Sequence, residues 1–213
     1  MMLSLLFQQP ILFIAWAAAI IIGITIHEFS HALAGVWQGD PTAKVSGRLT
    51  LNPLAHLSGV GFIMLLLVGF GWGKPVPFNP YNLKSKRWGP SIISLAGPAS
   101  NLIMAVSAGG ILKTLVTYTD LPSENLLLQF LNLLVIISLV LMIFNLIPIP
   151  PLDGSKVLFS VLDAPKYSHF KTWLSVKGPL VLVSVIFLDY LFNVNLFGGL
   201  FQLIINSVYK FIY

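Results

Sequence analysis

Four long apolar stretches constrain the fold of this chain more than any other feature. They cover residues 10–33, 91–112, 126–149 and 178–191. The first three reach the length of about 20 residues that a helix needs to cross a bilayer. Only 9% of the residues are charged, against about 25% in an ordinary soluble domain. We therefore predict an all-α polytopic membrane protein. We expect four to six membrane segments, because the apolar tail over residues 196–213 can cross the bilayer or lie in its interface.

The connection between the first two spans breaks this pattern. Residues 57–72 are apolar but short, and basic residues lie on both sides. We expect a re-entrant segment there, with both ends on one side of the membrane and its backbone covered by protein or lining a cavity. Residues 44–51 partly alternate between apolar and polar side chains, which predicts a small β-hairpin or edge strand. No repeat divides the chain, so we expect residues 1–213 to form a single integral-membrane domain.

The distribution of charge predicts the topology. No charged side chain precedes Glu28, whereas six basic residues lie between the first and second spans. The positive-inside rule therefore places this connection in the cytoplasm and the N-terminus outside. The net charge of +5 is spread over the membrane-flanking loops, so we expect a lipid bilayer as partner and no nucleic acid. The expected location is the plasma membrane of a prokaryote, as an integral multi-pass protein.

A short motif near the end of the first span carries the chemistry. Residues 27–31 read His-Glu-Phe-Ser-His, an HExxH pattern. His27 and His31 lie one helical turn apart on one face and can reach the same zinc ion, with Glu28 as general base. In a soluble helix the pattern could be a chance polar cluster. Within an apolar span three ionisable groups are costly unless they are paired or functional, which favours a zinc site.

A third ligand must come from elsewhere in the chain. The sequence contains no cysteine, so only His, Asp or Glu can complete the site. Asp153 stands out because the prolines before it must unwind the end of the third span, and Gly154 then permits a sharp turn. Alternatively, Asp153 caps the helix that follows. The residues alone favour ligation only slightly.

Several segments resemble one known family. Residues 27–31 together with residues 145–154, NLIPIPPLDG, resemble the site-2 protease family of M50-type intramembrane zinc metalloproteases, which pairs HExxH with a distant N-x-x-P-x-x-P-x-D-G segment. Four further segments resemble the short branch of that family, which has no PDZ or CBS domain: GDPTAK (39–44), LNPLAH (51–56), GWGKPVPFNP (71–80) and AGPASN (96–101). The chain departs from the pattern at Ser58-Gly59, where short relatives often have Asp-Pro.

The resemblance implies a site and an activity. One zinc ion per chain would be held by His27, His31 and Asp153, with Glu28 as general base and acid. Asn145 matches the family asparagine that contacts the substrate backbone. The implied substrates are transmembrane or membrane-associated protein segments, and the charge pattern places the site toward the cytoplasmic side.

Other polar residues have weaker claims. His56 could bind substrate or stabilise charge, but a lone loop histidine is at least as often a structural hydrogen-bonding residue. Asn101 could face the site or link helices through its amide. Gly97 is expected to permit close helix packing.

Two other functions remain open. A zinc transporter or sensor would use the same ligands and would not need Glu28 as an acid–base group. A non-catalytic membrane scaffold would typically have lost a ligand or the glutamate, and all four residues are present. A zinc-dependent endopeptidase is therefore the leading prediction. The oligomeric state is not predicted.

Overall fold

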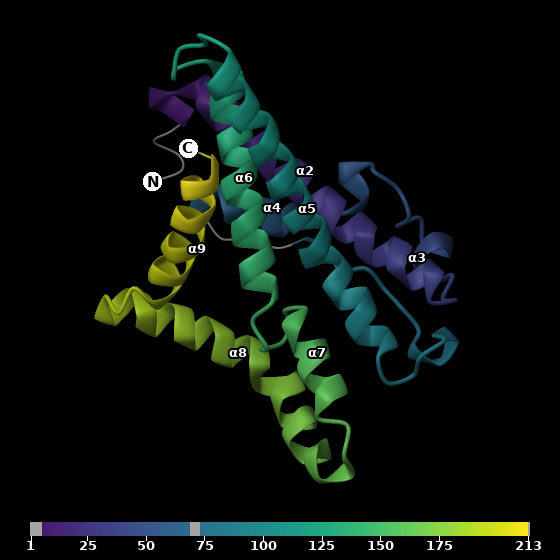
Figure 1. Ribbon diagram of the computed structural model, residues 1–213. Helices are drawn as coiled ribbons and strands as arrows, with labels where there is room; N and C mark the ends of the chain where they lie inside the picture. The colour runs from purple at the N-terminus through teal and green to yellow at the C-terminus, as the bar shows by residue number, and fades with distance from the viewer. Residues whose placement is uncertain (1–5, 69–72, 213) are drawn as a thin grey trace.

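The computed structural model describes residues 6–68 and 73–212, and helices make up most of this part of the chain (Figure 1). Four helical stretches of the described residues are long and apolar enough to cross a membrane. The helical, multi-span part of the predicted fold is therefore confirmed. The elements are α2 (Pro10–Trp37), α3 (Thr42–Val45), η1 (Pro53–Ala55), α4 (Gly59–Val68), η2 (Pro80–Asn82), α5 (Gly89–Tyr118), α6 (Leu126–Asn145), α7 (Gly154–Val161), η3 (Pro165–Tyr167), α8 (Ser168–Phe192) and α9 (Leu196–Ile212).

Local sequence signals set the ends of the long helices. Pro10 stands at the first position of α2, where its missing N–H costs nothing, and Gly39 follows the helix with a positive φ of 94°. The side chain of Asn125 caps α6 by accepting a hydrogen bond from the Leu127 N–H at 2.9 Å. The prolines that begin at Pro148 explain why α6 ends at Asn145 although the apolar stretch continues.

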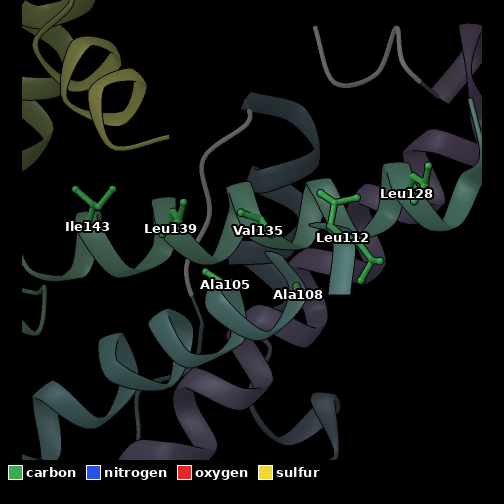
Figure 2. Packing of buried hydrophobic residues seen from close by; sticks show 8 residues of the cluster. Ala105, Ala108, Leu112, Leu128, Val135, Leu139 and Ile143 are labelled. Carbon is green, nitrogen blue, oxygen red and sulfur yellow. The ribbon is translucent and has the colours of Figure 1, made fainter. Parts of the chain in front are cut away.

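The three helices α2, α5 and α6 pack against one another at the centre of the molecule (Figure 1). Figure 2 shows the contact between α5 and α6, where Ala105 and Ala108 of α5 lie close to α6 and Val135 projects from α6. Small residues on one helix let the neighbouring backbone approach, and the resulting van der Waals contact stabilises helix pairs in lipid. The buried residues of this cluster are Ala105, Ala108, Leu112, Leu128, Leu131, Val135, Leu139 and Ile143.

The C-terminal helix α9 turns back at Asn193 and Asn195, both of which have positive φ. Its apolar face packs against the core of α5 and α6, and the Tyr209 hydroxyl donates a hydrogen bond to Asn132 Oδ1 at 2.6 Å. With 17 residues it is shorter than the four candidate spans.

The predicted β-hairpin over residues 44–51 is wrong. No strand occurs in the described ranges 6–68 and 73–212, and this segment contains the end of α3 followed by turns. The Asp40 side chain accepts hydrogen bonds from Thr42 N and Oγ1, which starts a helical turn, and Gly47 then reverses the chain at a φ of 69°. These local hydrogen bonds override the weak alternation of apolar and polar residues.

The short apolar segment after this turn contains α4. Its ten residues extend about 15 Å, half of a hydrocarbon core of about 30 Å. An isolated antiparallel bridge pairs Leu57 with Gly73, and the Lys74 N–H donates to the His56 carbonyl at 2.7 Å. The two ends of the segment therefore lie side by side, as a re-entrant path requires. Residues 69–72, which include the end of the predicted 57–72 segment, lie outside the described residues.

Asp40 stabilises the connection between α2 and α5, which contains α3, η1, α4 and η2. Its buried carboxylate accepts hydrogen bonds from Thr42, from the Asn79 N–H at 2.6 Å and from Asn82 Nδ2 at 2.9 Å. Burial alone raises the pKa of Asp40, but these hydrogen bonds outweigh it and hold the pKa below its ordinary value of 3.8. These hydrogen bonds thereby tie the start of the connection between α2 and α5 to its end.

We expect Asp40→Ala to lower the free energy of unfolding by about 1–3 kcal/mol, because Thr42, Asn79 and Asn82 lose hydrogen bonds to a charged acceptor. Since the folded pKa is depressed, the contribution of Asp40 is present above pH 3.8 and is lost as the pH falls through the folded value. Thermal unfolding of the detergent-solubilised protein measures both effects. The exposed Asp120→Ala is the control, and equal melting temperatures for the two variants would contradict this role.

Candidate metal centre

The two histidines of the HExxH motif meet inside the helix bundle. His27 and His31 lie one turn apart on α2 and are 5% and 7% exposed. Their Nε2 atoms are 3.0 Å apart, and the rings meet edge to face. The helical spacing predicted from the sequence therefore aims both Nε2 atoms at one point.

Helix α5 fixes the other ring nitrogen of each histidine. The Nδ1 atom of His31 lies 2.7 Å from the Ile93 carbonyl oxygen, which can only accept. The Nδ1 atom of His27 lies 2.5 Å from Asn101 Oδ1, while the amide nitrogen of Asn101 donates to the Gly23 carbonyl. Both imidazoles therefore carry a proton on Nδ1, which leaves Nε2 as a lone-pair acceptor when the rings are neutral.

A glycine on α5 makes room for the histidine pair. A Cβ atom added to Gly97 would lie 2.5 Å from His31 Nε2 and 2.6 Å from His27 Cε1. Any side chain at this position would occupy the space that the two rings use. Gly97 does permit close packing, as predicted, and it brings α5 close to the face of α2 that carries His27 and His31.

The third candidate ligand, Asp153, lies in the segment that follows the end of α6. After Asn145 the chain folds back so closely that a Cβ on Gly154 would collide with the Leu146 carbonyl, so only glycine fits. Asp153, 7% exposed, thereby reaches the histidine pair of α2, and its Oδ2 atom lies 3.1 Å from His27 Nε2 and 3.0 Å from His31 Nε2.

The capping alternative for Asp153 is wrong. Asp153 precedes α7, but its side chain makes no capping hydrogen bond. One carboxylate oxygen faces the histidines, and the other, Oδ1, lies 3.4 Å from Lys156 Nζ.

The centre therefore consists of three facing acceptors. His27, His31 and Asp153 each offer one ligand atom, and these atoms lie within 4.8 Å of one another. Two lone pairs and a carboxylate at such distances repel one another in a buried site unless a cation lies between them. Imidazole nitrogen and carboxylate oxygen are donors that zinc accepts, and second-shell acceptors on both Nδ1 atoms are typical of zinc-binding histidines. The residues present fit a zinc ion.

Glu28 lies next to this cluster on α2. A Cβ added to Gly73 would be 3.2 Å from Glu28 Oε1, so the chain at Gly73 passes directly over the carboxylate. The half-buried Glu28 has no hydrogen-bond or ion-pair partner in the described part of the chain. Its carboxylate is free to act on a molecule bound at the centre.

Comparisons with known proteins agree with this geometry. A family model described as peptidase family M50 matches residues 107–188, which include the Asp153 segment. The protein YwhC of Bacillus subtilis, named as a candidate zinc metalloprotease, is 41% identical over 145 residues, or 65% of each chain. Over residues 107–188 the chain is thus similar to peptidase family M50. The zinc that this family implies and the cluster of His27, His31 and Asp153 are thus in accord.

More distant M50 relatives carry similar names. Rip2 of Mycolicibacterium smegmatis, also named as a candidate zinc metalloprotease, is 32% identical over 152 residues, which cover 68% of this chain and 56% of Rip2. The chain thus spans 65% of YwhC and 56% of Rip2. No solved structure matches the chain significantly.

The remaining predicted site residues occupy different positions. Asn145 lies half-buried at the end of α6, and its amide donates to the Leu141 carbonyl at 2.9 Å. His56 is fully buried, its Nε2 atom donates to the Thr50 carbonyl at 2.7 Å, and burial lowers its pKa. This geometry favours the structural alternative for His56. Substrate contact by either residue stays a prediction.

Asn101 acts on the centre through His27. We expect Asn101→Leu to weaken zinc affinity by about 10- to 100-fold, because His27 loses the acceptor that holds its ring and tautomer. Competition with a chelating dye measures this affinity. Asn132→Leu on α6 is the control, since Asn132 contacts Tyr209 and not the centre. Unchanged affinity in Asn101→Leu would show that the amide only links the helices.

The sequence indicated only a packing residue at Gly97 and did not predict its contact with the histidine pair. It also did not predict that Arg48, one of the six basic residues before the second span, is buried. The AGPASN segment contains both Gly97 and Asn101, and it is the sequence signal from which a role of Gly97 at the centre could have been predicted. Nothing in the sequence indicates that the side chain of Arg48 is buried.

Proposed function

We propose that the protein is a zinc-dependent intramembrane endopeptidase that holds one zinc ion per chain through His27, His31 and Asp153. The observation that carries this proposal is the convergence of three buried acceptors beside Glu28, whose carboxylate has no partner among residues 6–68 and 73–212. The candidate-protease names of the M50 relatives support the same activity.

The reaction is hydrolysis of a peptide bond. Zinc, when bound, supplies Lewis-acid polarisation of the peptide carbonyl and activation of a water molecule. Glu28 accepts a proton from the attacking water as its oxygen adds to the carbonyl carbon, and returns that proton to the amine as the carbon–nitrogen bond breaks. The products are a carboxylic acid and an amine. The Nδ1 protons of His27 and His31 are held by hydrogen bonds to Asn101 Oδ1 and to the Ile93 carbonyl, so they take no part in this proton transfer.

The substrates would be segments of membrane proteins. The two candidate histidine ligands lie on the membrane-length helix α2, His27 about 15 Å from its end, so a substrate must bring an unwound peptide bond to this depth. Asn145, at the broken end of α6, is the proposed contact for the substrate backbone. The charge pattern supports a site open toward the cytoplasm of a prokaryotic cell, in its plasma membrane.

A zinc transporter is the competing function, and one experiment separates the two. The purified protein is placed in liposomes with a zinc-sensitive dye inside and a helix-destabilised membrane peptide in the bilayer. A protease cuts the peptide without raising internal zinc. Zinc entry without cleavage would favour a transporter, and neither signal from the zinc-loaded protein would favour a scaffold.

A further inference from the structure

The buried guanidinium of Arg48 lies near Glu28 with most of its donors unused. Arg48 is 4% exposed, and its Nη2 atom donates to the Lys74 carbonyl. Its Nε and Nη1 atoms are buried and have no hydrogen-bond partner in the described part of the chain. A buried N–H group without a partner is costly, so such donors usually meet an acceptor in the functional state.

The positive charge of Arg48 is also uncompensated. Arginine stays ionised in proteins, and among the described residues no ion pair joins Arg48 to a carboxylate. Burial lowers its pKa, and the nearby charge of Glu28 acts in the opposite direction. The two charges therefore influence each other without forming an ion pair.

The loop after the re-entrant segment connects the two groups. Gly73 packs on the Glu28 carboxylate, and the next residue, Lys74, receives the hydrogen bond from Arg48. Lys74 is held in turn by the His56 carbonyl. Arg48 is thus fixed on the same loop that covers the reacting carboxylate, and its orientation does not depend on a flexible surface contact.

We propose that Arg48 stabilises the negative charge that develops on the carbonyl oxygen of the peptide bond under attack. Its free Nε–H and Nη1–H groups donate hydrogen bonds to that oxygen as water adds to the carbonyl carbon, and no proton leaves the guanidinium. A fixed, buried donor is most effective where charge appears only in the transition state. This inference rests on the proposed peptidase function.

The test compares Arg48→Met and Arg48→Lys with the unchanged protein. We expect Arg48→Met to lower kcat by about 100- to 1,000-fold, with zinc content and the dissociation constant of an uncut peptide changed by less than about threefold. Arg48→Lys keeps the charge but loses the planar fork, so its kcat should lie in between. Arg87→Met, at the chain's other arginine, is the matched control and should cleave normally, because Arg87 pairs with the half-exposed Asp163.

A second measurement separates chemistry from folding. A phosphinic peptide, which imitates the charged transition state, should lose affinity for Arg48→Met in proportion to the fall in kcat/KM. The proposal is overturned if kcat is unchanged, if only KM rises, or if loss of zinc or of folding accounts for the whole effect in both variants. Failure of the unchanged, zinc-loaded protein to cut any peptide would instead reject the peptidase function itself.

Discussion

Replacing Gly97 by alanine is expected to weaken zinc binding by about 100-fold or more and to remove peptidase activity with it. The added methyl group would lie 2.5 Å from His31 Nε2 and 2.6 Å from His27 Cε1. These rings cannot move away freely, because Asn101 and the Ile93 carbonyl hold their Nδ1 atoms. Loss of a second-shell partner alone costs about 10- to 100-fold in affinity, and displacement of two ligands should cost more. Zinc titration against a chelating dye measures the change.

The same helix provides the control for this prediction. Gly110 also lies in α5, but a Cβ added there meets nothing within 4 Å. Gly110→Ala should leave zinc affinity unchanged, and it should raise the melting temperature slightly because alanine favours the helix. If Gly97→Ala bound zinc as tightly as Gly110→Ala, the proposed ligand geometry would be wrong.

Replacing Glu28 by glutamine is expected to lower kcat by about 100- to 10,000-fold while zinc stays bound. Glutamine has the shape of glutamate but cannot accept the proton from water, and Glu28 is not one of the three clustered groups. Single-turnover cleavage of a membrane peptide, together with metal analysis of the same sample, measures both quantities.

The chain's other glutamate is the matched control. Glu124 is exposed in the loop before α6, so Glu124→Gln should cleave at the normal rate. A zinc-loaded Glu28→Gln protein with normal cleavage would exclude Glu28 as the proton acceptor. Loss of zinc from this variant would show that Glu28 takes part in binding the metal.

The sequence predicts the parts of this site that depend on local geometry. The spacing of His27 and His31 follows from the helical period, and the prolines before Asp153 indicate a break at the end of α6. The span lengths follow in the same way from the apolar stretches. Resemblance to a family was needed to favour Asp153 as a ligand, since a carboxylate before a helix is also a good cap.

Contacts between distant segments could not be predicted in this way. Helices α2 and α5 run antiparallel, so His27 meets Asn101 while His31 meets Ile93. This register depends on side-chain packing along the whole interface and leaves no periodic signal in either segment. The predicted β-hairpin was wrong for a related reason. Hydrogen bonds from Thr42 to Asp40 outweighed the weak alternation of apolar and polar residues over 44–51.

Zinc-dependent cleavage inside a membrane segment tests the central claim most directly. The purified protein is stripped of metal, reloaded with one equivalent of zinc, and incubated in detergent with helix-destabilised membrane peptides whose products are identified by mass spectrometry. We expect cuts within the apolar segment only after zinc is restored. A protein that binds one zinc ion per chain and cuts none of these peptides, or that cuts them equally well without metal, would contradict the account.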